Sequence, residues 1–132
     1  MIVLDTHVLV WWLGVERKRL SSPALKSIER ELTSNEVIVS SISAWEIAML
    51  VQRNKLDLSM DVLSWLEVAG EIENLRFLPV DNVVAVKSQF LPGDFHADPA
   101  DRIIVTQARE LACPLVTADE KIRSYPHVAT IW

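Results

Sequence analysis

Four acidic residues stand where the sequence changes from a strand-like to a helix-like pattern. They are Asp5, Glu46, Asp101 and Asp119. Each follows an apolar, β-prone run or opens a helical pattern, which is where open α/β sheets place their active sites. Carboxylates gathered in one crevice repel one another, and a pair ~4 Å apart at an effective dielectric of ~20 costs about 4 kcal/mol. Protons or a hard cation would have to neutralise such a cluster, so the pattern predicts a divalent-metal site.

Asp5 and Asp119 both follow short apolar strands. Asp5 comes after the run Ile2–Leu4, and Asp119 comes just after Leu115–Val116. Asp5 could serve only as a helix cap, but Thr6 could do the capping and leave the Asp5 carboxylate free to face a crevice. For Asp119 the alternative is a surface residue that favours the positive end of a helix. Both readings stay open at this level.

Glu46 has a structural alternative of the same kind. It lies three residues after Ser43, which is the spacing of a capping box. Its helical face also carries Met49 and Leu50, so the carboxylate lies above an apolar stripe. A charge in that position needs a partner, and either a metal ion or Arg53 could provide one.

Asp101 gives the clearest signal of the four. On a helix it would share a face with Val105, Ala108 and Ala112, a small-residue face suited to packing on a sheet. Favourable placement near the positive end of the helix dipole is the alternative. Because Asp98 already supplies the cap, we expect Asp101 to have another role, with Asp98 itself at most in an outer shell.

Strand and helix patterns alternate along the chain. Strands are expected at residues 2–4, 37–39, 74–79, 115–116 and 128–131, and helices at 8–13, 22–32, 43–53, 60–70, 80–90, 98–112 and just after Thr117. This alternation favours an α/β fold with a small, mostly parallel central sheet covered by helices on both faces. No repeat or linker divides the sequence, so we expect residues 1–132 to form one domain.

The composition narrows the class of protein. Half of the 132 residues are hydrophobic, and the mean hydropathy of +0.21 suggests an apolar surface covered by a partner or a second copy. The net charge of −5 provides no electrostatic footprint for nucleic acid and counts against a simple binding module. The apolar run at residues 8–13 is too short to cross a bilayer, and a cytoplasmic protein is expected.

Other kinds of site fit less well. The histidines, including His96, have no ligand spacing, although His96 precedes Asp98 by two residues and could touch substrate or metal-bound water. The three glycines form no phosphate loop. A phosphatase with Asp5 as nucleophile would need a second Asp where this chain has His7, and a receiver-like domain would need an acidic pair there. An interaction module with an inactive site stays open.

Four segments in order resemble PIN-domain proteins, and within them the VapC-type toxins of bacterial toxin–antitoxin pairs. They are Met-Ile-Val-Leu-Asp-Thr-His at the start, Ser-Ser-Ile-Ser-Ala-Trp-Glu-Ile, His-Ala-Asp-Pro-Ala-Asp-Arg-Ile-Ile from His96, and Val-Thr-Ala-Asp ending at Asp119. Thr117 matches a hydroxyl residue that often precedes the fourth acid. The resemblance implies a PIN-like three-layer sandwich in which the four acids surround Mg²⁺ or Mn²⁺, a usually dimeric endoribonuclease, and a cognate antitoxin that fills the active site.

The residues and the resemblance lead to one hypothesis: hydrolysis of RNA by water activated on a carboxylate-held Mg²⁺ or Mn²⁺. Asp5 and Asp101 would contact the ion directly or through one water, and Glu46 and Asp119 would complete the site. The basic residues that could contact the RNA backbone, with solvated surface as the alternative, are Arg17, Lys18, Arg19, Arg53, Lys55 and Arg102.

Overall fold

One five-stranded sheet, with every pairing parallel, organises the protein. The computed structural model describes all residues from 1 to 132. The strand order is β3-β2-β1-β4-β5, and the strands are β1 (Ile2–Leu4), β2 (Val37–Ser40), β3 (Leu75–Leu78), β4 (Leu115–Val116) and β5 (Thr130–Ile131). The expected fold class, a small parallel sheet between helices, is confirmed.

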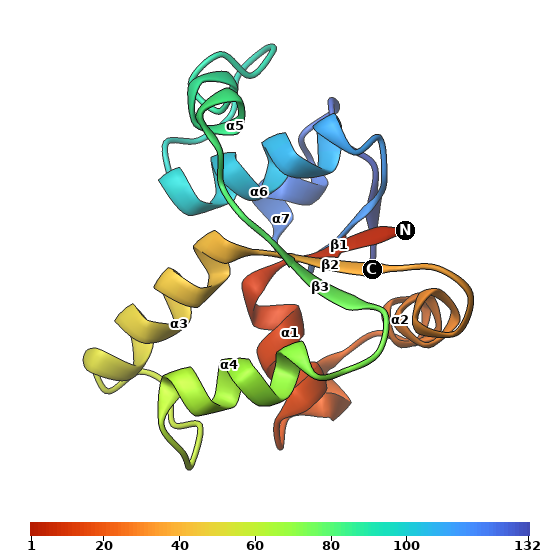
Figure 1. Ribbon diagram of the computed structural model, residues 1–132. Helices are drawn as coiled ribbons and strands as arrows, with labels where there is room; N and C mark the ends of the chain where they lie inside the picture. The colour runs from red at the N-terminus through yellow and green to blue at the C-terminus, as the bar shows by residue number, and fades with distance from the viewer.

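The helices lie on both sides of this sheet. They are α1 (Thr6–Leu13), α2 (Ser22–Ser34), α3 (Ser41–Gln52), α4 (Val62–Gly70), α5 (Asn82–Lys87), α6 (Pro99–Glu110) and α7 (Glu120–Arg123), with a 3-10 turn η1 (Arg17–Arg19). In Figure 1, α1 to α4 lie on one side of the strands, and α6 and α7 lie on the other, with α5 beyond α6. No helix is both long and apolar enough to cross a membrane.

The short apolar strands divide their side chains between two cores. Ile2 and Leu4 belong to a core with residues of α1, α2, α3 and α4. Val3, between them, points to a second core with Ile104 and other residues of α6 and α7. Successive side chains of a strand point to opposite faces, so a strand covered on both faces must be apolar throughout. This explains the uninterrupted run Ile2–Leu4.

The chain connections place a crevice between β1 and β4. From β1 the sheet grows through β2 and β3 on one side and through β4 and β5 on the other. Ligands of open α/β sheets bind at such a switch point, outside the carboxyl ends of the strands. The residues that follow these two neighbouring strands are Asp5 and Thr117.

Two local predictions were wrong. Helix α3 is capped by Ser40, whose hydroxyl accepts from the Ile42 amide; Ser43 is a buried residue inside the helix, so Glu46 is not part of a capping box. On α6, Val105 and Ala108 are fully buried as expected, but the helix ends at Glu110. Ala112 is exposed in the turn that follows, so it does not extend the sheet-facing side.

Truncating the core residue that holds α6 on the sheet should destabilise the protein. Ile104 is fully buried in the core beneath Asp101. We expect Ile104→Ala to lower the free energy of unfolding by roughly 2–5 kcal/mol and Ile104→Val by about 0.5–1.5 kcal/mol. Urea denaturation measures both, and equal effects of the two substitutions would contradict tight packing at this position.

Candidate active site

Asp5 is fixed between β1 and β4. The residue is only 8% exposed. One carboxylate oxygen accepts from the Thr6 amide at 2.8 Å, and the other accepts from the Thr117 hydroxyl at 2.7 Å. Asp5 therefore caps α1 itself, whereas the sequence had left that role open to Thr6. Burial raises the pKa of the Asp5 carboxyl, and the bonds from Thr117 and Thr6 oppose that rise.

Thr6 instead holds Glu46. The Thr6 hydroxyl donates to Glu46 Oε1 at 2.6 Å and lies 2.8 Å from the Ser43 hydroxyl. Since a hydroxyl has one proton, Ser43 donates to Thr6 when Thr6 donates to Glu46. Burial raises the pKa of Glu46, the Thr6 bond lowers it, and the Asp5 charge raises it again. Sequence reasoning missed this use of Thr6 and Ser43; the signal was a pair of hydroxyl residues following two neighbouring strands.

The pKa of Asp101 is strongly raised. It lies in the first turn of α6, where its amide donates to the capping carboxylate of Asp98 at 3.0 Å. Burial, the largest cause, and the charges of Asp5, Asp98, Asp119 and Glu46, in that order of importance, together raise the pKa of Asp101 to about 8. Five carboxyl groups from four separate segments thus act on one another at this edge of the sheet.

His96 lies against Asp101. Its Nε2 atom is 3.1 Å from Asp101 Oδ2, yet this buried nitrogen has no hydrogen-bond partner of good geometry in the protein. The guanidinium of Arg102 donates to the carbonyls of Ser88, Phe95 and His96. Arg102 therefore holds the loop that carries His96, and its Nε and Nη1 atoms are engaged within the protein.

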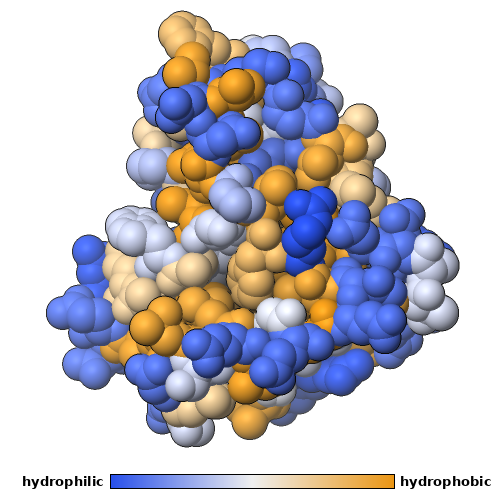
Figure 2. Space-filling model, viewed as in Figure 1, coloured by the Kyte–Doolittle hydropathy of each residue, from blue (hydrophilic) through white to orange (hydrophobic).

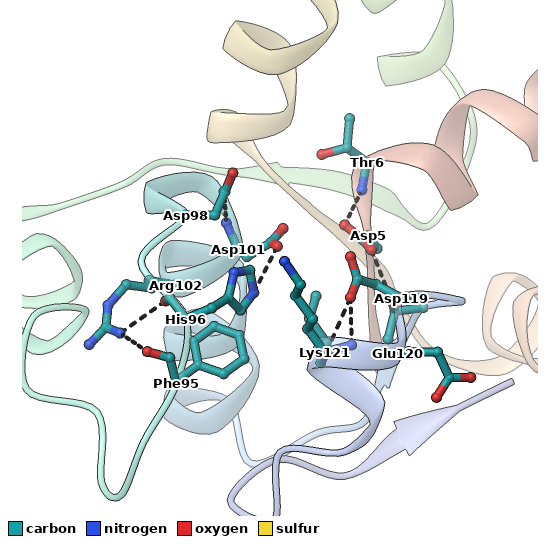
Figure 3. Close-up of polar contacts among 12 residues, drawn as sticks. Asp5, Thr6, Phe95, His96, Asp98, Asp101, Arg102, Asp119, Glu120 and Lys121 are labelled. Atoms are coloured by element: carbon teal, nitrogen blue, oxygen red, sulfur yellow. Dashed lines mark hydrogen bonds and ion pairs between the residues drawn. The ribbon is translucent and has the colours of Figure 1, made fainter.

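Thr117 joins the last acid to the first. Besides donating to Asp5, its hydroxyl accepts from the Asp119 amide at 3.0 Å. The helix expected just after Thr117 is α7, and Asp119 caps it: one of its oxygens accepts from the Lys121 amide at 2.8 Å. Figure 3 shows Asp5, Asp101 and Asp119 directed toward one shared space, with the Lys121 side chain extending into it between Asp101 and Asp119. The sequence analysis did not select Lys121.

A cleft of about 290 Å³ opens beside these acids. Its walls come from β1, α1, η1 and the segment after β4, and they are Asp5, His7, Val8, Trp11, Arg19, Ala118 and Asp119. A larger hollow of about 420 Å³ lies where α6 ends and β4 begins, with Arg109, Cys113 and His127 in its walls. It contains no carboxylate, so the smaller cleft is the candidate site.

The donor chemistry fits a hard cation held in part by water. No three acidic or histidine side chains are arranged to hold one ion by themselves. Mg²⁺ commonly binds through one or two carboxylates and keeps several waters, and oxygen ligands suit Mg²⁺ and Mn²⁺. Asp5 is buried and Asp101 half-buried, and both have a raised pKa. These two carboxyls and the unpartnered His96 nitrogen match such a water-rich site better than a closed cage of protein ligands.

The basic residues are scattered. Arg19 lines the cleft, whereas Arg17 lies 3.7 Å from Glu29 of α2 and Lys18 makes no ion pair. Arg53 and Lys55 follow the carboxyl end of α3. Of the residues expected to meet RNA, only Arg19 is a wall of the cleft that holds Asp5 and Asp119.

Comparison with known proteins agrees with this geometry. A family model described as the PIN domain matches residues 2–128. The chain belongs to the PIN domain family. It is 38% identical over 133 residues to "Ribonuclease VapC22" from Mycobacterium tuberculosis (strain ATCC 25618 / H37Rv), with 99% of this chain and 98% of that protein covered. The expected resemblance to PIN-domain proteins of the VapC type is confirmed.

Solved structures share the fold of this PIN domain. The VapBC2 structure from Rickettsia felis, bound to a DNA fragment from its promoter, superposes with a TM-score of 0.69 at 18% identity, covering 98% of this chain and 97% of that one. A toxin–antitoxin complex from Klebsiella pneumoniae gives a TM-score of 0.64 at 16% identity, with the same coverage. At these identities the likeness concerns the fold.

When no metal is bound, removing the charge of Asp101 should stabilise this PIN domain. In the folded protein the pKa of Asp101 is about 8, against 3.8 for an unperturbed Asp. Unfolding therefore releases a proton between these pH values, and stability falls as the pH rises through that window. We expect Asp101→Asn to be roughly 2–5 kcal/mol more stable than the wild type at pH 8, and little different near pH 4.

Urea denaturation in EDTA at both pH values measures this difference. Asp94→Asn is the matched control, since Asp94 is an exposed acid of the 91–97 loop. A stability gain of the same size at pH 4 and pH 8, or a loss at pH 8, would contradict the raised pKa.

Proposed function

We propose that residues 1–132 form a Mg²⁺- or Mn²⁺-dependent endoribonuclease, the toxin of a toxin–antitoxin pair that acts in the cytoplasm. The observation that carries this proposal is the group of carboxylates at the carboxyl edge of the sheet, where burial and like charge together raise the pKa of Asp101 to about 8. The 38% identity to a protein named a ribonuclease, over 99% of this chain, supports RNA as the substrate.

Each acidic residue has a proposed part. Asp5 and Asp101 hold the divalent ion, directly or through one water, and Glu46 and Asp119 complete the negative site and orient water. When bound, the ion would offset these charges, draw in the RNA phosphate and lower the pKa of water. Thr117 keeps the Asp5 carboxylate aimed at the crevice, and Thr6 does the same for Glu46. His96, beside Asp101, is placed to hydrogen-bond water or substrate.

The proposed partners are a cognate antitoxin and a second copy of the chain. Large apolar side chains are exposed on α3, between α3 and α4, on α4, and on or just after α5: Trp45, Met60, Leu63, Val68, Val83, Val86 and Phe90. Figure 2 shows apolar side chains gathered along the middle of one face, between α3 and α4 below and α5 and α6 above. Extended apolar surface of this kind marks protein interfaces. Two similar solved structures are described as VapBC or toxin–antitoxin complexes.

An inactive interaction module is the second candidate. The exposed apolar side chains, such as Phe90 at 80% and Leu63 at 72%, fit it equally well. The buried and perturbed acids do not, because an interaction module gains nothing from carboxylates that destabilise its fold. RNA cleavage by purified protein without its antitoxin separates the two.

Neutralising the first or third acid should abolish cleavage. Asp5→Asn and Asp101→Asn keep the side-chain shape but remove a charged ligand, so we expect the cleavage rate to fall by at least about a thousandfold, and toxicity in cells to disappear. Asp94→Asn should cleave like the wild type. The readout is cleavage of total RNA in Mn²⁺ buffer, with circular dichroism to check the fold. Full activity in Asp101→Asn would contradict the proposed site.

Metal should stabilise the folded protein, and more so at higher pH. An ion that binds only the native state raises the melting temperature. It must displace the proton that Asp101 keeps below a pH of about 8, so we expect a larger shift with millimolar Mn²⁺ at pH 8.5 than at pH 6. Differential scanning fluorimetry measures both shifts. A shift that is absent, or that is unchanged in Asp5→Asn, would count against binding at this site.

A further inference from the structure

Besides its carboxylates, the cleft has an aromatic wall. His7 and Trp11 lie one turn apart on α1, and their ring centres are 5.9 Å apart. The guanidinium of Arg19 lies over the Trp11 ring, 4.2 Å from its centre, and Trp132 contacts Trp11 from another direction, with 6.1 Å between ring centres. All of these except Trp132 are walls of the cleft that also holds Asp5 and Asp119.

This wall is not part of either hydrophobic core. The neighbouring Trp12 is 7% exposed and packs in the larger core. Trp11 is only half-buried and belongs to neither core, and His7 is exposed. Covering the exposed part of an apolar ring removes it from water and is favourable. The half-exposed ring of Trp11 is therefore accessible to a ligand in the cleft.

Of the three basic residues of η1, only Arg19 reaches the aromatic wall. Within η1, Arg19 reaches Trp11 and the cleft, while it also pairs with Glu16 at 2.9 Å. Arg17 faces Glu29, and Lys18 lines no part of the cleft. In a chain of net charge −5, Arg19 brings a positive group to the walls of the cleft next to the carboxylates.

Aromatic rings and arginine planes side by side are the means by which proteins hold unpaired RNA bases. Bases splayed from a single strand stack on aromatic side chains or guanidinium planes, and such stacking tolerates many sequences because every base has a π-face. Bases inside a duplex are already stacked and cannot enter such a wall without being extruded.

We propose that His7, Trp11 and Arg19 form a subsite for one unpaired nucleotide next to the phosphate that is cleaved. Its base stacks on the surface formed by Trp11, His7 and the Arg19 guanidinium, and the Arg19 charge attracts the phosphate that joins it to the scissile position. The three are positioning residues, and the substrate is RNA that is single-stranded at the cut. This inference rests on the proposed ribonuclease function.

Binding should be measured apart from cleavage. The probe is a short fluorescein-labelled oligouridylate, alone or paired with the complementary oligoadenylate, and the protein is the Asp101→Asn full chain, in which cleavage is blocked. Fluorescence anisotropy gives the affinity. In this background we expect Trp11→Leu and Arg19→Gln each to weaken binding of the single strand about tenfold. Lys18→Gln, which removes the same charge from the same turn, should change it less than about twofold.

Two further comparisons exclude a merely structural role. Trp11→Phe keeps a stacking surface, so it should retain most of the affinity that Trp11→Leu loses. The duplex should bind more weakly than the single strand and should be insensitive to Trp11→Leu. The subsite is overturned if Arg19→Gln and Lys18→Gln have equal effects, if single strand and duplex lose affinity equally, or if Trp11→Leu binds normally.

Cleavage of RNA by the otherwise wild-type protein separates this inference from the function on which it rests. We expect Trp11→Leu to raise KM more than it lowers kcat. If Trp11→Leu cleaves RNA with a normal KM, the proposed subsite is wrong and the ribonuclease function stands. If the protein cleaves no RNA under any metal condition but binds the probe through Trp11 and Arg19, the ribonuclease function is wrong and the subsite stands.

Discussion

Repulsion among carboxylates at the carboxyl edge of the sheet is the constraint on which the rest of this structure depends. Asp5 is buried between β1 and β4, and Asp101 is held over the same edge by α6. Taking carboxylates out of water and placing them together opposes ionisation twice, by lost hydration and by like charge. The pKa of about 8 at Asp101 expresses both effects. The fold provides hydroxyl groups for partial relief, and the proposed cation would provide the remainder.

The backbone does much of the positioning. Asp5, Asp98 and Asp119 each cap a helix through one oxygen. The caps fix the carboxylates relative to α1, α6 and α7, and Asp98 and Asp119 each keep a second oxygen without a hydrogen bond to the protein. A residue that caps a helix can therefore also be one of the proposed site residues. Helix capping does not prevent a carboxylate from also binding a ligand, because a cap uses only part of the carboxylate's capacity to accept hydrogen bonds.

The sequence predicted those features that depend on short-range patterns, such as strands and helix caps. The apolar run Ile2–Leu4 and the cap at Asp98 followed from rules that act over a few residues. The cap of α3 was misplaced because Ser40, Ser41 and Ser43 all fit the preference for a hydroxyl, and only the end of β2 decides among them. The approach of Arg19 to Trp11, and of Thr117 to Asp5 across more than a hundred residues, depends on the closed fold. Sequence spacing does not predict such long-range contacts, and for the same reason it did not indicate that His7 and Lys121 lie at the site.

Locating the cation is the most direct test of the central claim. Crystals of the protein soaked in Mn²⁺ would give an anomalous difference map in which the ion identifies itself. We expect one peak in the cleft, within direct or one-water reach of the carboxylates of both Asp5 and Asp101. A protein that cleaves RNA but shows Mn²⁺ only at sites remote from Asp5 and Asp101 would contradict a cluster whose charges are balanced by a metal ion.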